Sequence, residues 1–171
     1  MKKIFLTAIA AACLSILSAC SDDPEPTIAE KCSGGLSEDC LVGTWNLKAI
    51  QTLGDETTAI TYVDFGATPS TLVFTDDGKF EFTYTTNATV SEMAGDGCGG
   101  TKSYGSWEIA GVTLKIKIGR TDCQETGRSY TVTPTITPTS LNLNMLLFHE
   151  NDMTDALSKA NATEYYVRLA Q

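Results

Sequence analysis

The stretch Leu41-Val42-Gly43-Thr44-Trp45-Asn46-Leu47 opens the first run of this chain that alternates in the manner of a β-strand. One side of the predicted strand carries Trp45, Leu47 and Ala49, with polar residues between them. The glycine two residues before the tryptophan lets the chain bend tightly beneath the indole ring. A tryptophan placed in this way can plug one end of a β-barrel. The stretch therefore predicts the start of a strand-rich domain.

The chain begins with the pattern of an export signal, predicted to span residues 1–19. Lys2 and Lys3 form a positive region, and residues 4–17 form an apolar region that is too short for a typical transmembrane helix. Leu17-Ser18-Ala19-Cys20 then resembles the lipobox of bacterial lipoproteins. The resemblance implies cleavage before Cys20, a diacylglycerol thioether on its sulfur and an acylated amine, typically with palmitate. Two or three acyl chains anchor a protein stably. The alternative is an ordinary secretory signal with an incidental cysteine.

A flexible acidic tether is predicted at residues 20–40. Its first part, Ser21-Asp22-Asp23-Pro24-Glu25-Pro26, is too polar and proline-rich to bury a core, so we expect an extended spacer. A serine followed by acidic residues after the lipidated cysteine also resembles the surface-export tag of some Gram-negative lipoproteins; a generic linker is the alternative. Ser21 does not resemble the inner-membrane retention signal. We therefore expect a protein anchored to the outer membrane and exposed at the cell surface or in the periplasm.

The charge of the chain limits its partners. Its formal net charge is −9, and removal of Lys2 and Lys3 with the leader makes it two units more negative. Such a chain offers no series of cations for nucleic-acid phosphates. It is equally unsuited to electrostatic binding of anionic lipid, so membrane contact must come from the acyl chains. No feature of the sequence identifies a protein partner.

Four cysteines remain in the mature chain, and an even number in an exported protein predicts disulfides. Two runs, 104–109 and 112–118, read as a hairpin around Ala110-Gly111. That turn would place Trp107 opposite Leu114, and the same register carried outward places Cys98 opposite Cys123, near disulfide distance. The remaining pair, Cys32 and Cys40, would close a small glycine-containing loop.

The rest of the chain predicts an all-β domain at residues 41–171. Residues 71–75 and 79–84 form the clearest hairpin, with Asp76-Asp77-Gly78 as a three-residue loop. Further strands are predicted at 128–133, 141–148 and 164–169, with 59–65 ambiguous and a short helix at 151–160. Short strands at steady intervals indicate an up-and-down antiparallel β-barrel of about 8–10 strands, with a sandwich as the runner-up. The predicted interior is bulky: Trp45, Leu72, Phe74, Phe80, Phe82, Tyr84, Trp107, Leu114, Ile116, Tyr130, Val132 and Leu143.

The Gly-x-Trp start, Gly43 and Trp45, resembles the signature of the lipocalins, and in particular of lipocalin-like domains of bacterial lipoproteins. In that family an arginine near the last strand packs on the tryptophan, and Arg168 is the matching position here. The resemblance implies a cation–π pair between Arg168 and Trp45. The alternative for Arg168 is a solvated strand charge.

The sequence shows no constellation for catalysis. His149 is the only histidine, Gly-x-Ser-x-Gly is absent, and none of the cysteine spacings is Cys-x-x-Cys. Glu150, Asp152 and Asp155 lack EF-hand spacing. We expect neither an enzyme nor a metal site, and no cofactor.

Two functions remain from the sequence. In the first, the barrel holds a small hydrophobic molecule, as lipocalins do, admitted at the end opposite Trp45 between the 76–78 and 87–100 loops. In the second, the barrel is solid and the protein binds a partner through its loops or an edge. Bulky inward residues favour a filled interior, whereas the family resemblance favours a ligand.

Overall fold

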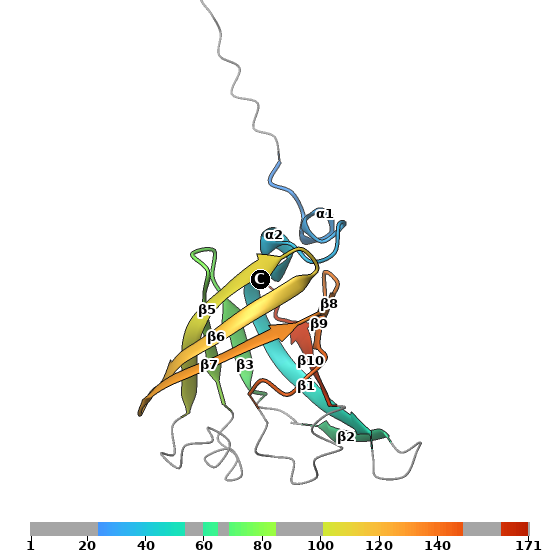
Figure 1. Ribbon diagram of the computed structural model, residues 1–171. Helices are drawn as coiled ribbons and strands as arrows, with labels where there is room; N and C mark the ends of the chain where they lie inside the picture. The colour runs from blue at the N-terminus through green and yellow to red at the C-terminus, as the bar shows by residue number, and fades with distance from the viewer. Residues whose placement is uncertain (1–23, 54–59, 65–68, 85–100, 149–161, 171) are drawn as a thin grey trace, which may run out of the picture.

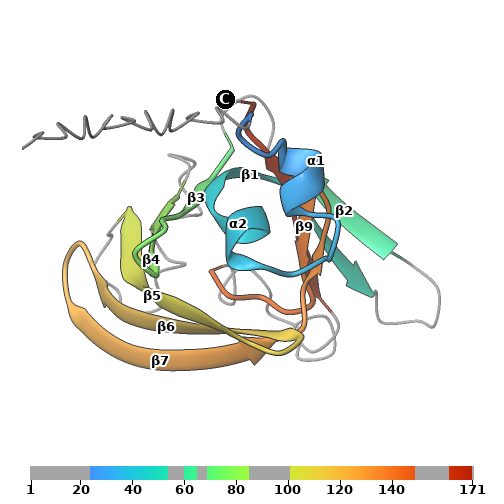
Figure 2. The same ribbon diagram turned by 90° about the horizontal axis from the view of Figure 1, so that it is seen from above.

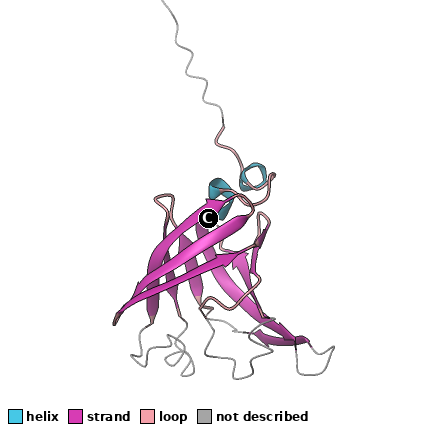
Figure 3. Cartoon of the chain, in the orientation of Figure 1, coloured by secondary structure: helices cyan, strands magenta, loops and turns pink. Residues whose placement is uncertain are grey.

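The computed structural model describes residues 24–53, 60–64, 69–84, 101–148 and 162–170, which form two short helices and one antiparallel sheet (Figures 1 and 3). The helices are α1 (Ile28–Lys31) and α2 (Glu38–Leu41). The strands are β1 (Gly43–Leu53), β2 (Ile60–Asp64), β3 (Thr71–Phe74), β4 (Lys79–Thr83), β5 (Lys102–Ala110), β6 (Thr113–Thr121), β7 (Glu125–Val132), β8 (Thr135–Ile136), β9 (Ser140–Leu143) and β10 (Thr163–Arg168). The prediction of an all-β architecture is confirmed.

The ten strands form one sheet in the order β7-β6-β5-β4-β3-β1-β10-β9-β8, with β2 paired to β1 off this path. Along one edge of β1, Gly43–Asn46 pairs with β3 and the second half of the strand pairs with β2. The other edge of β1 pairs with β10. Because strand neighbours follow chain order around the curl, the topology is up-and-down. Seen from above, the strands curl around α2 (Figure 2).

The two edge strands of this sheet, β7 and β8, follow one another in the chain through Thr133 and Pro134. Proline has no N–H to donate to a ladder, and β8 is only two residues long. No β7–β8 pairing occurs among the described strands. Next to this connection, Asn144 follows β9 and donates from Nδ2 to the carbonyl of Thr133 at 3.2 Å, in line with the β8–β9 register. The barrel is therefore a curled sheet whose seam is not a backbone ladder.

The core lies inside the curl, and alternation along the strands places it there. The predicted inward residues are buried with the exception of Tyr130, which is half-buried against the cluster. The set is Trp45, Leu72, Phe74, Phe80, Phe82, Tyr84, Trp107, Leu114, Ile116, Val132 and Leu143.

In β1 the alternation breaks after Leu47. The pairing with β10 shifts between Leu47 and Ala49, which makes a bulge at Lys48. As a result Ile50 is fully buried, while Ala49 is only half-buried. The prediction that Ala49 continues the inward face of Trp45 and Leu47 is wrong because a bulge reverses the parity of the strand.

The β5–β6 hairpin turns one residue later than predicted. Its turn is Gly111-Val112, so Trp107 lies opposite Ile116 rather than Leu114. A bulge at Gly119 shifts the ladder again, and Ser103 then lies opposite Thr121. The register that placed Cys98 opposite Cys123 is therefore wrong.

Cys123 itself lies in the turn between β6 and β7, where the chain has left the ladder. It is disulfide-bonded. Its predicted partner, Cys98, lies outside the described residues, so the pairing stays a prediction.

The segment before β1 is folded, in contrast to the flexible tether predicted up to residue 40. Thr27 caps α1 with a reciprocal capping box to Glu30, and Ser37 caps α2. Cys32 and Cys40 are joined by the expected disulfide. Cys40 and Leu41 are fully buried against the barrel. Among the described residues, the folded part therefore includes α1 and α2 as well as the strands from residue 43 onward.

Strand β9 also differs from its prediction. It ends at Leu143, whereas alternation had suggested a strand to Phe148. Residues 144–148 are irregular, and they bring Leu146, Leu147 and Phe148 into buried positions. The ambiguous run at 59–65 contains β2, and the predicted helix at 151–160 lies outside the described residues. Within the described residues, no helix has the length and apolarity needed to cross a membrane.

Candidate functional site

One end of the barrel is closed by a cluster around Trp45 and Arg168. The two residues lie directly opposite each other on β1 and β10, and the guanidinium carbon is 4.0 Å from the ring centroid. The fully buried indole donates from Nε1 to the carbonyl of Leu41 at 2.9 Å, which fixes the end of α2. The cation–π pair implied by the family resemblance is present.

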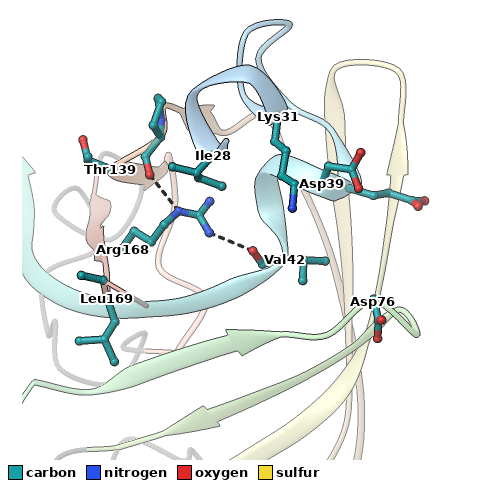
Figure 4. A pocket seen from close by; sticks show the side chains of 11 residues that line it. Ile28, Lys31, Asp39, Val42, Asp76, Thr139, Arg168 and Leu169 are labelled. Carbon is teal, nitrogen blue, oxygen red and sulfur yellow. Dashed lines mark hydrogen bonds between the residues drawn. The ribbon is translucent and has the colours of Figure 1, made fainter. Parts of the chain in front are cut away.

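Arg168 also ties three chain segments together. Nε donates to the carbonyl of Pro138 (2.8 Å) and Nη1 to that of Val42 (2.9 Å), as Figure 4 shows. Nη2 donates to the carbonyl of Cys40. Partial burial lowers the pKa of this guanidinium from its usual range, yet arginine stays protonated in proteins. Arg168 is therefore a structural clamp for the segment that contains α1 and α2 (residues 28–41), here called the cap, and not a solvated strand charge.

Gly43 makes room for this clamp. Its φ is +137°, in a region that side chains rarely adopt, and a Cβ built there would lie 2.6 Å from Arg168 Nη1. The glycine is therefore required both by its backbone conformation and by its neighbour.

Outside the clamp, a pocket of about 710 Å³ opens at the same end (Figure 4). Its lining combines apolar and charged side chains: Ile28, Lys31, Glu38, Asp39, Val42, Asp76, Pro138, Thr139, Arg168, Leu169 and Ala170. Asp76 belongs to the β3–β4 turn, and Phe74 pairs with Gly43. The 76–78 turn thus lies at the Trp45 end, so the prediction that it borders ligand access at the opposite end is wrong.

The barrel interior is lined with aromatic rings. Phe148 stacks on Phe82 with a centroid separation of 4.1 Å and an interplanar angle of 2°. It meets Phe80 in an edge contact at 5.7 Å and 62°. Phe82 in turn contacts Tyr84 edge-on at 4.6 Å. These rings form a continuous apolar wall.

A polar cluster meets this wall from β10. Glu164 is fully buried, and its Oε1 accepts the backbone N–H groups of Leu147 (2.9 Å) and Phe148 (3.1 Å). Its Oε2 accepts the hydroxyl of Tyr166 at 2.7 Å. Nearby, the Tyr84 hydroxyl and the Ser103 hydroxyl share a buried hydrogen bond at 3.4 Å. The interior thus holds a few convergent polar groups in apolar surroundings.

Burial and the neighbouring Glu164 carboxylate together raise the pKa of Tyr166 well above its usual value. Tyr166 is therefore a neutral hydrogen-bond donor across the physiological pH range.

Three other residues considered in the sequence have no described position. Cys20, Cys98 and His149 lie outside the described residues. No group of three or more metal-ligating side chains occurs within the described part of the chain.

Glu164, Tyr166 and Phe148 were not singled out from the sequence. The signal for the first two was available, because a period of two from Arg168 puts Tyr166 and Glu164 on the same inward face. Phe148 carried no such signal, since it lies beyond the end of β9.

A curled antiparallel sheet of ten strands, closed at one end by a tryptophan and an arginine, defines a lipocalin-like barrel. The chain belongs to the family of lipocalin-like domains, whose family model, "Lipocalin-like domain", matches residues 41–143.

Two solved structures from Bacteroides species are similar to this chain. A lipocalin-like protein from Bacteroides uniformis has 16% identity and a TM-score of 0.46, over 75% of this chain and 98% of that one. An uncharacterized protein from Bacteroides eggerthii has 13% identity and a TM-score of 0.46, over 75% and 99%. No curated protein matches the chain significantly.

Proposed function

We propose that this protein is a non-catalytic lipoprotein of the outer membrane, anchored through acylated Cys20, whose barrel binds one small, mostly apolar molecule. The lipobox at residues 17–20 supports the anchor. Membership of the lipocalin-like family supports the binding role.

The observation that carries the binding proposal is the composition of the interior. Small-molecule sites are mostly apolar and aromatic, with a few polar groups that fix the orientation of the ligand. Here Phe80, Phe82 and Tyr84 supply the wall, and Glu164 with Tyr166 supplies the polar end. Burial of apolar ligand surface contributes about 25 cal/mol per Å² before association costs, which is consistent with about micromolar affinity.

The second candidate is a solid barrel that binds a protein partner through its outer surface. Dense packing favours it, because Phe148 fills the space beside Phe82 and both rings are almost wholly buried. In that case the interior serves stability alone.

The test is a titration of the full chain in lipid nanodiscs, with empty nanodiscs as the blank. Decanoic acid, retinol and 2-phenylethylamine are added separately, and the fluorescence of the two tryptophans is followed. We expect saturable binding of one compound per chain. Trp107 contacts Phe74 inside the barrel, so Trp107→Phe should abolish most of the signal. Absence of saturable binding by all three would contradict the proposal and favour the solid barrel.

A further inference from the structure

The side chain of Phe148 occupies a flat slot in the barrel interior. Its ring lies parallel to Phe82 and meets Phe80 at an angle, and only 2% of the residue is exposed. Phe82 and Phe80 come from the regular strand β4, whereas Phe148 comes from an irregular segment. The strand residues are therefore the wall, and Phe148 is the occupant of the slot.

The backbone of the same residue occupies the polar end. The N–H of Phe148 and the N–H of Leu147 both donate to Glu164 Oε1. In phenylalanine the ring is joined to its nitrogen through two carbons. The group that fills the interior is thus an aromatic ring two carbons away from an N–H donor, seated between an aromatic wall and a carboxylate.

This segment lies outside the strand ladders of the sheet. Residues 144–148 pair with no strand among the described elements. Besides the two bonds to Glu164, its hydrogen bonds to described residues include Asn144 Nδ2 to the carbonyl of Thr133 (3.2 Å) and a local turn in which Met145 N–H donates to the carbonyl of Leu143 (2.7 Å). A segment outside a backbone ladder opens more easily than the strands around it.

On the basis of the proposed function, we propose that the barrel binds arylethylamines, which displace Phe148 and reproduce its contacts. The aromatic ring of the ligand stacks on Phe82, and its ammonium group donates to Glu164. Withdrawal of Phe148 alone would leave a buried carboxylate without two of its donors, which is costly. A cationic amine two carbons from the ring restores them, whereas a neutral or anionic group does not.

The experiment measures binding of four matched compounds to the full chain in nanodiscs by calorimetry. The reference compound is 2-phenylethylamine. Compared with it, 2-phenylethanol changes the hydrogen-bond donor, 3-phenylpropionate reverses the charge, and 2-cyclohexylethylamine replaces the planar ring. We expect 2-phenylethylamine to bind at least tenfold more tightly than the others. Decanoic acid is titrated in parallel as a probe of the general binding function.

Variants locate the site. Phe148→Ala should bind 2-phenylethylamine at least tenfold more tightly than the native chain, because the internal competitor is gone. Phe148→Leu, which keeps an apolar side chain but removes the ring stacked on Phe82, serves if the alanine variant does not fold, and it should also bind 2-phenylethylamine more tightly than the native chain. Glu164→Gln should weaken amine binding at least tenfold and leave 2-phenylethanol unchanged. Val112→Ala, at an exposed turn, is the control and should match the native chain.

The outcomes separate this inference from the proposed function. Binding of decanoic acid without binding of 2-phenylethylamine to the native chain or the Phe148 variants would overturn the inference and leave the function standing. Absence of binding by every probe would overturn both. Amine binding that is unchanged in the Phe148 and Glu164 variants would place the amine elsewhere and also overturn the inference.

Discussion

At the scale of single residues, the closed end depends on three residues, Gly43, Trp45 and Arg168, that only work together. Arg168 can lie over Trp45 and reach the carbonyls of the cap only because position 43 has no side chain. The Gly-x-Trp pattern therefore reflects a contact with Arg168, which lies more than a hundred positions later in the chain. Each member can be tested separately.

Gly43→Ala should destabilise the fold by about 1–3 kcal/mol, because it combines an unfavourable φ with a clash against Arg168. The free energy of unfolding is measured by urea denaturation. Gly34→Ala is the control, since a Cβ at Gly34 meets nothing within 4 Å, and it should change stability by less than about 0.5 kcal/mol. Equal effects of the two substitutions would contradict the role of Gly43.

Arg168→Lys should lower the free energy of unfolding by about 2 kcal/mol. Lysine keeps the charge but lacks the planar fork that serves three carbonyls and stacks on the indole. Arg120→Lys is the matched control, because Arg120 lies over Tyr104 on the exposed outer face, 4.6 Å from the ring centroid. That change should cost less than about 1 kcal/mol. If lysine at position 168 were as stable as arginine, the clamp would be unimportant.

The raised pKa of Tyr166 predicts how the free energy of unfolding changes at high pH. Its pKa in the folded state is raised well above the usual value, so unfolding releases a proton once the pH passes about 10. Stability should be unaffected by this residue below about pH 9 and should fall above about pH 10, by up to about 1.4 kcal/mol per pH unit.

Urea midpoints at neutral pH and at about pH 9, 10 and 11 measure this slope. Tyr166→Phe should remove part of it, and Tyr130→Phe, at a half-buried position on β7, should retain it. An identical slope in the Tyr166 variant would contradict the assignment.

At the scale of the elements, the alternation of apolar and polar residues predicted the strands. It gave the wrong face or register where the chain departs from a period of two. The inward faces of β3 and β4 agree with the alternation of Leu72, Phe74, Phe80 and Phe82. The bulge at Lys48 was not predictable, because a bulge is set by pairing with β10 and not by β1 alone. The β5–β6 turn was missed by one residue because Ala110-Gly111 and Gly111-Val112 both contain the glycine that the turn needs.

The candidate site was only partly predictable for the same reason. Arg168 and Trp45 were linked by family resemblance, and strand parity from Arg168 extends to Glu164. Phe148, in contrast, enters the core from irregular backbone, and no periodic pattern describes such a residue.

The cap formed by α1 and α2 should depend on its disulfide. Helices of four residues have no stability of their own, so tertiary contacts and the Cys32–Cys40 bond must hold them. Replacing both cysteines by serine should cost about 2.5 kcal/mol by the chain-entropy estimate for this short loop. Calorimetric or urea unfolding measures the loss. Ser33→Ala, inside the same loop, is the control and should change little; a double serine variant as stable as the native chain would contradict the prediction.

At the scale of the whole molecule, the short chain between the predicted anchor and the cap limits how the barrel can face the membrane. Only seven residues separate Cys20 from the first residue of α1, and an extended chain of that length spans roughly 28 Å. The capped end with Trp45 and Arg168 should therefore face the membrane, and the opposite end of the barrel should face away from it.

The anchor itself is tested by Cys20→Ala. Without the thiol there is no thioether to diacylglycerol, and the acyl chains are the membrane contact expected for so acidic a chain. The variant should lose incorporation of labelled palmitate, and it should not be cut before residue 20 by the lipoprotein signal peptidase. Cys13→Ala is the matched control, because Cys13 lies in the predicted leader, and it should be labelled, processed and membrane-bound like the native chain. A Cys20→Ala protein that is still labelled and processed would show that the anchor lies elsewhere, and the membrane-facing orientation of the cap would fall with it.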